Sequence, residues 1–204
     1  MSGPQSLRLG DSCGVLRSLL VGSLVATALS GQTAFDASAF GPATADPVVI
    51  SGSWTLSCSG PASFDFGPRE VVFAPGAVVF TDGCTLTAAR FVVSAGATIG
   101  SGGVVLHTNH AGSPHDGAVV VAGTIDASGN FVTDGLPIGV SASGTITVFG
   151  SGVVRSRAGT DVFLSGGSIL LESVGDLVID SGAAPIDAGS PSPGGSGGDV
   201  TVRS

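Results

Sequence analysis

The three histidines of the chain lie within one short segment, HTNHAGSPHDG at residues 107–117. His107, His110 and His115 are joined there by Asp116. Imidazole and carboxylate groups are good zinc ligands, and three protein ligands plus a water form a catalytic zinc site. These four residues are therefore the candidate metal ligands. Their spacing matches no helical or zinc-ribbon pattern, so we favour the alternative, a polar insertion between two strands.

A second candidate metal site is the segment GGSGGDVTV at residues 194–202. It nearly matches the G-G-x-G-x-D-x-U-x nonapeptide that binds calcium in β-rolls, but Thr201 stands where a large apolar residue is expected. Asp126 and Asp187, each in an Ile-Asp-Ala corner, are better explained as turn residues that accept hydrogen bonds from their own backbone. We therefore predict no required cofactor, with calcium and zinc as the two candidates.

Catalysis by carboxylates or by a basic residue is the next possibility. Hydrolysis of a polysaccharide needs two carboxylates several ångströms apart on a groove, and a lyase needs a base. Arg155 and Arg157 lie on one strand face and are either such bases or solvated side chains. No serine-nucleophile elbow or Lys-containing phosphate loop is present, so no catalytic residue is predicted. The candidate acids are Asp161, Glu172, Asp176 and Asp180.

The composition limits which scaffold positions these residues. The 204 residues include 34 Gly and no Lys; 43% are apolar, 11% are charged, and the net charge is -8. A disordered chain has the opposite balance of apolar and charged residues, so this chain should fold. Short runs of Val, Ile and Leu between glycines indicate an all-β protein. Seven scattered arginines do not form the basic patch that nucleic acid requires.

A repeat indicates how the strands are arranged. VVFAPGAVVF begins at Val71 and FVVSAGATIG begins 20 residues later, at Phe91. Three strands of about seven residues fill such a period, which is typical of a β-solenoid. We therefore predict a parallel β-helix with about 20–30 residues per coil. Asp-Gly pairs at 82–83, 116–117 and 134–135 keep a meander of hairpins as the alternative.

The later coils are expected to be longer and to carry their insertions as loops on one face. Comparable coil starts lie near Val119, Thr145, Ser168 and Asp199. The expected strands in this part include residues 145–149, 153–156 and 161–164.

The N-terminal residues have the features of an export signal. Arg8 and Arg17 precede the apolar run Leu19–Leu29, which is too short to span a membrane but has the length of a signal-peptide core. We predict a leader over residues 1–39 and a β-helix domain over residues 40–204; a packed N-terminal helix is the alternative. In an oxidising compartment Cys58 and Cys84 can form a disulfide, and two buried thiols are the alternative.

Several segments resemble one family of exported proteins. GTIDASGN (123–130), APIDAGS (184–190) and GGSGGDVTV (194–202) resemble coils of secreted bacterial right-handed β-helix proteins. These are the filamentous-haemagglutinin and autotransporter-passenger type, and the resemblance covers about residues 70–204. It implies a right-handed β-helix at the cell surface, an adhesive or stalk-like role, and surface glycans or cell-surface proteins as partners. Because DVTVRS has the pattern of a strand without a polar cap, further solenoid coils are expected downstream.

Two functions follow from these observations. The expected one is an exported, non-catalytic β-solenoid that serves as a structural or adhesive segment of the cell surface. The alternative is a carbohydrate-active β-helix enzyme, a polysaccharide lyase or hydrolase. Acids clustered in a groove across adjacent coils favour the enzyme, whereas dispersed acids favour the structural role.

Overall fold

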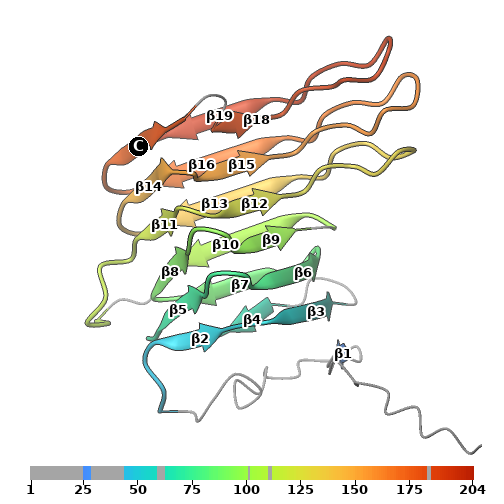
Figure 1. Cartoon of the computed structure of the whole chain (residues 1–204). Helices are drawn as coiled ribbons and strands as arrows, with labels where there is room; N and C mark the ends of the chain where they lie inside the picture. Colours follow the sequence, from blue (N-terminus) through green and yellow to red (C-terminus); the bar gives the residue numbers. More distant parts are fainter. Residues whose placement is uncertain (1–24, 29–43, 59–62, 101, 110–111, 183–184) are drawn as a thin grey trace, which may run out of the picture.

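The computed structural model describes residues 25–28, 44–58, 63–100, 102–109, 112–182 and 185–204. Within these ranges the chain forms nineteen strands and no helix. The strands build three sheets in which every pairing is parallel (Figure 1). This arrangement is a parallel β-helix and confirms the predicted fold class.

From β2 onwards each sheet takes every third strand of the chain, and β1 is added at the end of sheet A. Sheet A contains, in spatial order, β1 (Val25–Ala28), β3 (Ser53–Cys58), β6 (Val78–Asp82), β9 (Thr98–Gly100), β12 (Thr124–Asp126), β15 (Val153–Arg155) and β18 (Ile186–Asp187). Sheet B contains β2 (Val48–Ile50), β5 (Glu70–Phe73), β8 (Arg90–Val93), β11 (Val119–Val121), β14 (Ile146–Gly150) and β17 (Leu177–Ser181). Sheet C contains β4 (Ser63–Asp65), β7 (Thr85–Ala88), β10 (Val104–Thr108), β13 (Ile138–Ala142), β16 (Ile169–Ser173) and β19 (Val200–Arg203).

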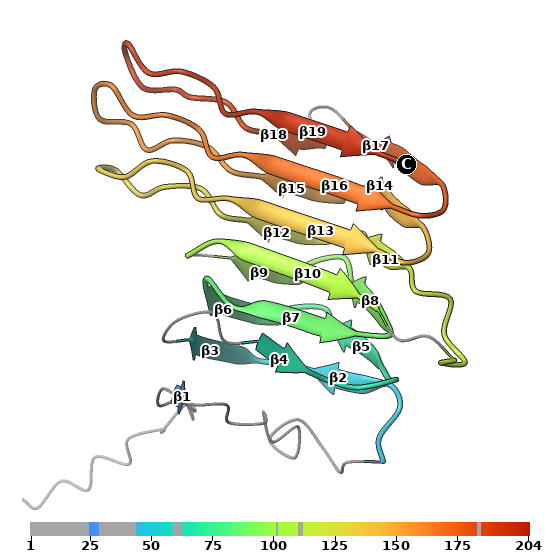
Figure 2. The ribbon, with the colours of Figure 1, turned by 180° about the vertical axis from the view of Figure 1, so that it is seen from behind.

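The chain passes through sheets B, A and C in that order six times. Coil 1 consists of β2, β3 and β4, and coil 6 consists of β17, β18 and β19. Figure 2 shows the coils stacked into a column, with β1 next to β3 at one end. Each sheet therefore runs along the column, and each coil contributes one strand to it.

The core is a set of aliphatic and aromatic ladders that run along the column. In β10, for example, Val104, Leu106 and Thr108 are buried, whereas the two residues between them are half-buried on the outer face. In the inner coils, as in β10, each inward side chain is in register with its equivalents in the coils on both sides. Burial of a Val, Leu, Ile or Phe side chain contributes about 1.5–3 kcal/mol, so adjacent coils stabilise each other.

The two repeated segments occupy equivalent positions in neighbouring coils. Val71 pairs with Phe91 in sheet B, which confirms the 20-residue repeat. The corner inside each segment contains a glycine in the left-handed region, Gly76 at φ 80° and Gly96 at φ 79°. Residues other than glycine rarely adopt this backbone conformation. The two corners are also joined directly, because the amide of Gly76 donates a hydrogen bond to the carbonyl of Gly96 at 3.2 Å. The shape of the corner therefore favours a glycine at this position of both segments.

Only some of the coil starts predicted for the second half of the chain occupy equivalent positions in the coils. Residues 48, 71, 91, 119, 146 and 177 occupy one position in sheet B, so successive coils are 23, 20, 28, 27 and 31 residues long. Val119 and Thr145 do mark coil starts in this sheet. Ser168 and Asp199 instead precede strands β16 and β19, which belong to sheet C.

Two strand assignments also differ from the prediction. Residues 161–164 form a turn and irregular chain instead of a strand, because their apolar side chains face outwards. The strand at residues 138–142 was missed because its Gly, Ser and Ala residues weaken the strand pattern. Ile138, Val140 and the small Ala142 face the core there, and all three are buried.

The predicted leader lies almost entirely outside the described residues. Its described part is β1, which lies inside the apolar run 19–29 and pairs in parallel with β3. The described part of the run is therefore a strand, whereas the alternative to a leader was a packed helix. The export signal itself stays a prediction.

Candidate functional site

Three long loops leave the column at the same corner, where the chain passes from sheet A to sheet C. They join β12 to β13 (127–137), β15 to β16 (156–168) and β18 to β19 (188–199). The corresponding connection between β6 and β7 in coil 2 has only residues 83–84. Figures 1 and 2 show the three loops projecting side by side from the column. We call this structure the fin.

Hydrogen bonds between successive loops hold the fin together. The amide of Gly159 donates to the carbonyl of Thr133 at 2.9 Å, and that of Asp161 donates to Phe131 at 3.0 Å. The amide of Phe163 then donates to Pro193 of the third loop at 3.0 Å. The backbone ladder of the sheets thus continues into the loops. The fin is therefore an ordered extension of the column.

Two ion pairs join adjacent coils at the base of the fin. Arg155 contacts Asp126 of the preceding coil, with 2.7 Å between Nη2 and Oδ2. Arg157 contacts Asp187 of the following coil, and its Nε donates to Oδ2 at 2.6 Å. The two arginines considered as possible lyase bases are thus paired with carboxylates. They join the three coils that carry the fin.

The two aspartates also have the turn role predicted for them. Oδ1 of Asp126 accepts a hydrogen bond from the amide of Ser128 at 3.0 Å, and Oδ1 of Asp187 accepts one from Gly189 at 2.9 Å. Burial alone would raise the pKa of Asp126, but the hydrogen bonds from Arg155 and Ser128 outweigh it and lower the pKa. The hydrogen bond from Arg157 lowers the pKa of Asp187. Both carboxylates are therefore stabilised in their charged form.

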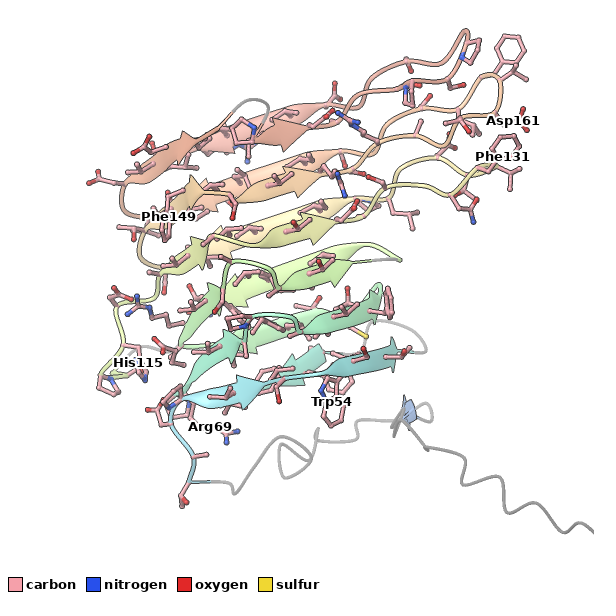
Figure 3. The ribbon with its side chains drawn as sticks, in the orientation of Figure 1. Trp54, Arg69, His115, Phe131, Phe149 and Asp161 are labelled. Carbon is pink, nitrogen blue, oxygen red and sulfur yellow. The ribbon has the colours of Figure 1, made fainter. Side chains whose placement is uncertain are left out.

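The tip of the fin exposes large apolar side chains. Phe131 is 67% exposed and Val132 59% in the first loop, while Val162 is 54% and Phe163 76% exposed in the second. Phe163 also has a φ of 61°, a left-handed conformation that is uncommon for a bulky residue. Backbone strain of this kind clusters at functional sites. Figure 3 shows Phe131 and Asp161 at the outer end of the loops.

The candidate zinc ligands that the structure describes have different surroundings and different contacts. His107 is half-buried on the outer face of β10, next to Thr87 and Ser141 in the sheet register. His115 places Nε2 2.9 Å from Oδ2 of Asp46, which lies 69 positions earlier. Asp116 accepts a hydrogen bond from the amide of Ala118 at 3.1 Å. His110 lies outside the described residues.

No metal cluster is assembled by this segment in the described part of the chain. Among the described residues, no three or more His, Cys, Asp or Glu residues lie together in a way that can hold a metal ion. Asp199, the acid of the calcium-like nonapeptide, is exposed and directly precedes β19. Because His110 lies outside the described residues, the metal site and the polar insertion both stay predictions.

This insertion acts as a clasp on the first two coils. The hydroxyl of Ser113 donates to the carbonyl of Pro68 at 3.0 Å, and His115 reaches Asp46 beside coil 1. Asp46 also accepts a hydrogen bond from the amide of Glu70 at 3.0 Å. The hydrogen bond from His115 is the main cause that lowers the pKa of Asp46. The clasp thus ties coils 1 and 2 to the start of coil 4.

The candidate catalytic acids lie in four different places. Asp161 is in the fin, and Asp176 is at the corner between β16 and β17. Glu172 lies on the outer face of sheet C, 3.8 Å from Arg203, and Asp180 lies on β17 of sheet B. The four acids thus lie on sheets B and C, at the corner between them and in the fin.

Cys84 is fully buried and disulfide-bonded, and its sulfur lies 3.5 Å from the carbonyl oxygen of Leu56. The side chain of Cys58 lies outside what the structure describes. The register places Ser57 beside Asp82, so the backbone of Cys58 runs near the turn that leads to Cys84. Their pairing stays a prediction.

In the described ranges, no helix has the length and apolar character needed to cross a membrane. Comparison with known proteins adds no relative: no protein-family model, curated protein or solved structure matches the chain. The class is thus defined by the fold itself, and the chain is a parallel β-solenoid.

Proposed function

We propose that this chain is an exported, non-catalytic β-solenoid that forms a structural or adhesive segment of the cell surface. In this proposal the fin is the contact surface, and the column holds it in place. The observation that carries the proposal is the fin tip, where four large apolar side chains are exposed on loops held by backbone hydrogen bonds. Exposed apolar groups gathered on an ordered support are typical of interaction sites.

We propose that the chain is related to the filamentous haemagglutinins and autotransporter passengers. Its support is the parallel β-helix together with the Gly-rich coil segments, in which Asp126 and Asp187 cap their own corners. The partners we propose are glycans or proteins of a cell surface. An aromatic ring such as Phe131 or Phe163 offers a flat apolar face to either kind of partner.

The contact role is tested with a chain in which the tip is made polar. We expect the double variant Phe131→Ser/Phe163→Ser to lose about tenfold or more in binding to cells and to glycan arrays, since buried aromatic anchors dominate interfaces. Phe149→Ser is the matched control, because Phe149 is 43% exposed but lies on β14, away from the fin (Figure 3). Equal binding by the wild-type chain and the double variant would remove the fin from the proposal.

Export and the lack of catalysis need separate measurements. Residues 1–39 fused to a reporter enzyme should carry it out of the cytoplasm, and retention of the reporter would contradict export. The purified chain should leave acidic polysaccharides at their original length. Depolymerisation by the chain would instead support the carbohydrate-active alternative.

A further inference from the structure

The outer face of sheet B carries an apolar row that runs along the side of the column. Each of its six strands contributes one outward residue, and these residues lie in register from coil to coil. None of the six is charged, and Val49 is 50% exposed. We call this surface the valine row. It consists of Val49, Val72, Val92, Val120, Thr147 and Val178.

The other two sheets present more polar rows on their outer faces. One outward row of sheet C consists of Asp65, Thr87, His107, Ser141, Glu172 and Arg203. One outward row of sheet A consists of Thr55, Phe80, Gly100, Asp126, Arg155 and Asp187. Sheet B differs, since strands with continuous apolar runs such as Val119–Val121 are typical of sheets covered on both faces. Its outer face therefore has the composition of a contact surface.

The valine row lies along the side of the column, so coils added at either end would lengthen it without covering it. Six strands about 4.8 Å apart, each with about five residues, form a flat face of about 29 by 17 Å. Stable complexes bury about 800 Å² per partner, and this face has about 500 Å². It therefore suits a weak, reversible contact with a dissociation constant in the micromolar range or above.

We propose that the valine row binds the valine row of a second copy, with the two columns side by side and running in opposite directions. The two-fold axis then lies along the strands and passes between β8 and β11, which are neighbours in sheet B. The two sheets pack face to face about 10 Å apart. A contact of this kind uses one patch on both subunits and closes as a dimer. The opposed pairs are Val92 with Val120, Val72 with Thr147, and Val49 with Val178.

The residues beside the valine row agree with opposed columns. Phe149 is 43% exposed and lies two residues after Thr147 on the same outer face of β14 (Figure 3). The two-fold axis places it opposite the small Ala74 of the second copy, so each ring has room. In columns running in the same direction, Asp176 would instead lie opposite Asp180 of the second copy, twice, and opposed like charges are destabilising.

Charge substitutions in the valine row test the proposal on the full chain by analytical ultracentrifugation. Val92→Lys and Val120→Glu each place a charge opposite a valine of the second copy. We expect either change to raise the dimer dissociation constant about tenfold or more, because the charge loses water without gaining a partner. In the double variant Val92→Lys/Val120→Glu, each ammonium group faces a carboxylate of the other copy. This variant should dimerise about tenfold more tightly than either single variant.

Val105→Lys is the matched control, because Val105 is an outward valine of the same coil as Val92 but lies on sheet C. It should leave the dissociation constant unaltered, and circular dichroism checks that every variant is folded. A wild-type chain that stays monomeric at all accessible concentrations would overturn the proposal and leave the face to a different protein. Single variants that dimerise like wild type would also overturn it. A double variant that dimerises more weakly than both single variants would show columns running in the same direction and would contradict the proposed arrangement.

The result is independent of the contact role proposed for the fin. A weak dimer dissociates at the low concentrations at which binding to cells is measured, so Phe149→Ser stays a valid control for the fin. Loss of dimerisation would leave the binding by the fin unchanged, and loss of binding by the fin would leave the dimer unchanged.

Discussion

Ile50 and Ile179 occupy the same position in sheet B, one in the first coil and the other in the last. Ile50 is 0% exposed, whereas Ile179 is 39% exposed. The residue type, the sheet and the inward direction are the same at both ends. β2 and β17 are each the last strand of sheet B among the described residues, so strand pairing alone does not account for the difference in exposure. Side chains at equivalent positions of two coils thus differ in burial.

The two ends also differ in how they are secured. At the first end, β1 extends sheet A, and the clasp ties His115 to Asp46. At the last end, the strand edges and Val200 and Val202 face solvent. The first coil is thus held by two further contacts, the β1 strand and the clasp.

The largest expected effect comes from replacing the two equivalent isoleucines. Ile50→Ala should destabilise the chain by about 2–5 kcal/mol, because it removes three carbons from a packed core. Ile179→Ala should cost about half as much or less, since much of its surface already faces water. Urea unfolding in dilute solution measures both costs. Equal losses of unfolding free energy would show that the last coil is covered in solution.

An intermediate effect is expected at the base of the fin. Asp126→Asn weakens the pair with Arg155 and should lower the unfolding free energy by up to about 1 kcal/mol at neutral pH, because the pair is partly exposed. The folded-state pKa of Asp126 is below its usual value of 3.8, so its contribution is present above that pH. It is lost as the pH falls from 3.8 through the lower folded-state pKa. The stability difference between wild type and variant should shrink over that interval.

Asp134→Asn is the matched control for this measurement. Asp134 lies in the same fin, where its Oδ1 accepts a hydrogen bond from the amide of Ser165 at 2.7 Å. Asparagine retains that acceptor oxygen, so this change should cost less. A variant Asp126→Asn with the same pH profile as wild type would show that the ion pair contributes nothing to the fin.

The smallest expected effect is at the clasp. His115→Ala removes the main hydrogen bond that lowers the pKa of Asp46, so this pKa should rise towards 3.8. An NMR titration of the Asp46 carboxyl carbon measures the change. His107→Ala should leave the titration unaltered, because His107 lies on the outer face of β10. If the pKa of Asp46 moved equally in both variants, the contact between His115 and Asp46 would not be the cause of its lowered pKa.

The repeat made the fold predictable from the sequence. Two ten-residue segments at Val71 and Phe91 carry inward-facing apolar residues and a corner glycine, and those local features determine the coil. The turn roles of Asp126 and Asp187 were predictable for the same reason, since each carboxylate bonds an amide two residues later.

The fin was predictable only in outline, as loops on one face of the longer later coils; its position and its exposed tip depend on which loops come into register across coils of different length. The apolar residues 161–164 fit a strand, and only the neighbouring loops show that Val162 and Phe163 face solvent. The histidine segment was misleading for a related reason. Proximity in sequence grouped the histidines, but β10 fixes His107 on one sheet while the insertion carries His115 to Asp46.

Cysteine pairs on the outer face of sheet B test the stacking of coils most directly. Thr147 and Val178 are register partners on adjacent strands, whereas Val120 and Val178 are separated by the strand that carries Thr147. Adjacent strands lie about 4.8 Å apart, within disulfide range, and next-nearest strands lie about 10 Å apart, beyond it. Thr147→Cys/Val178→Cys should therefore form an intramolecular disulfide under mild oxidation, and Val120→Cys/Val178→Cys should not. Failure of the first pair, or equal crosslinking of both, would contradict a column of parallel coils.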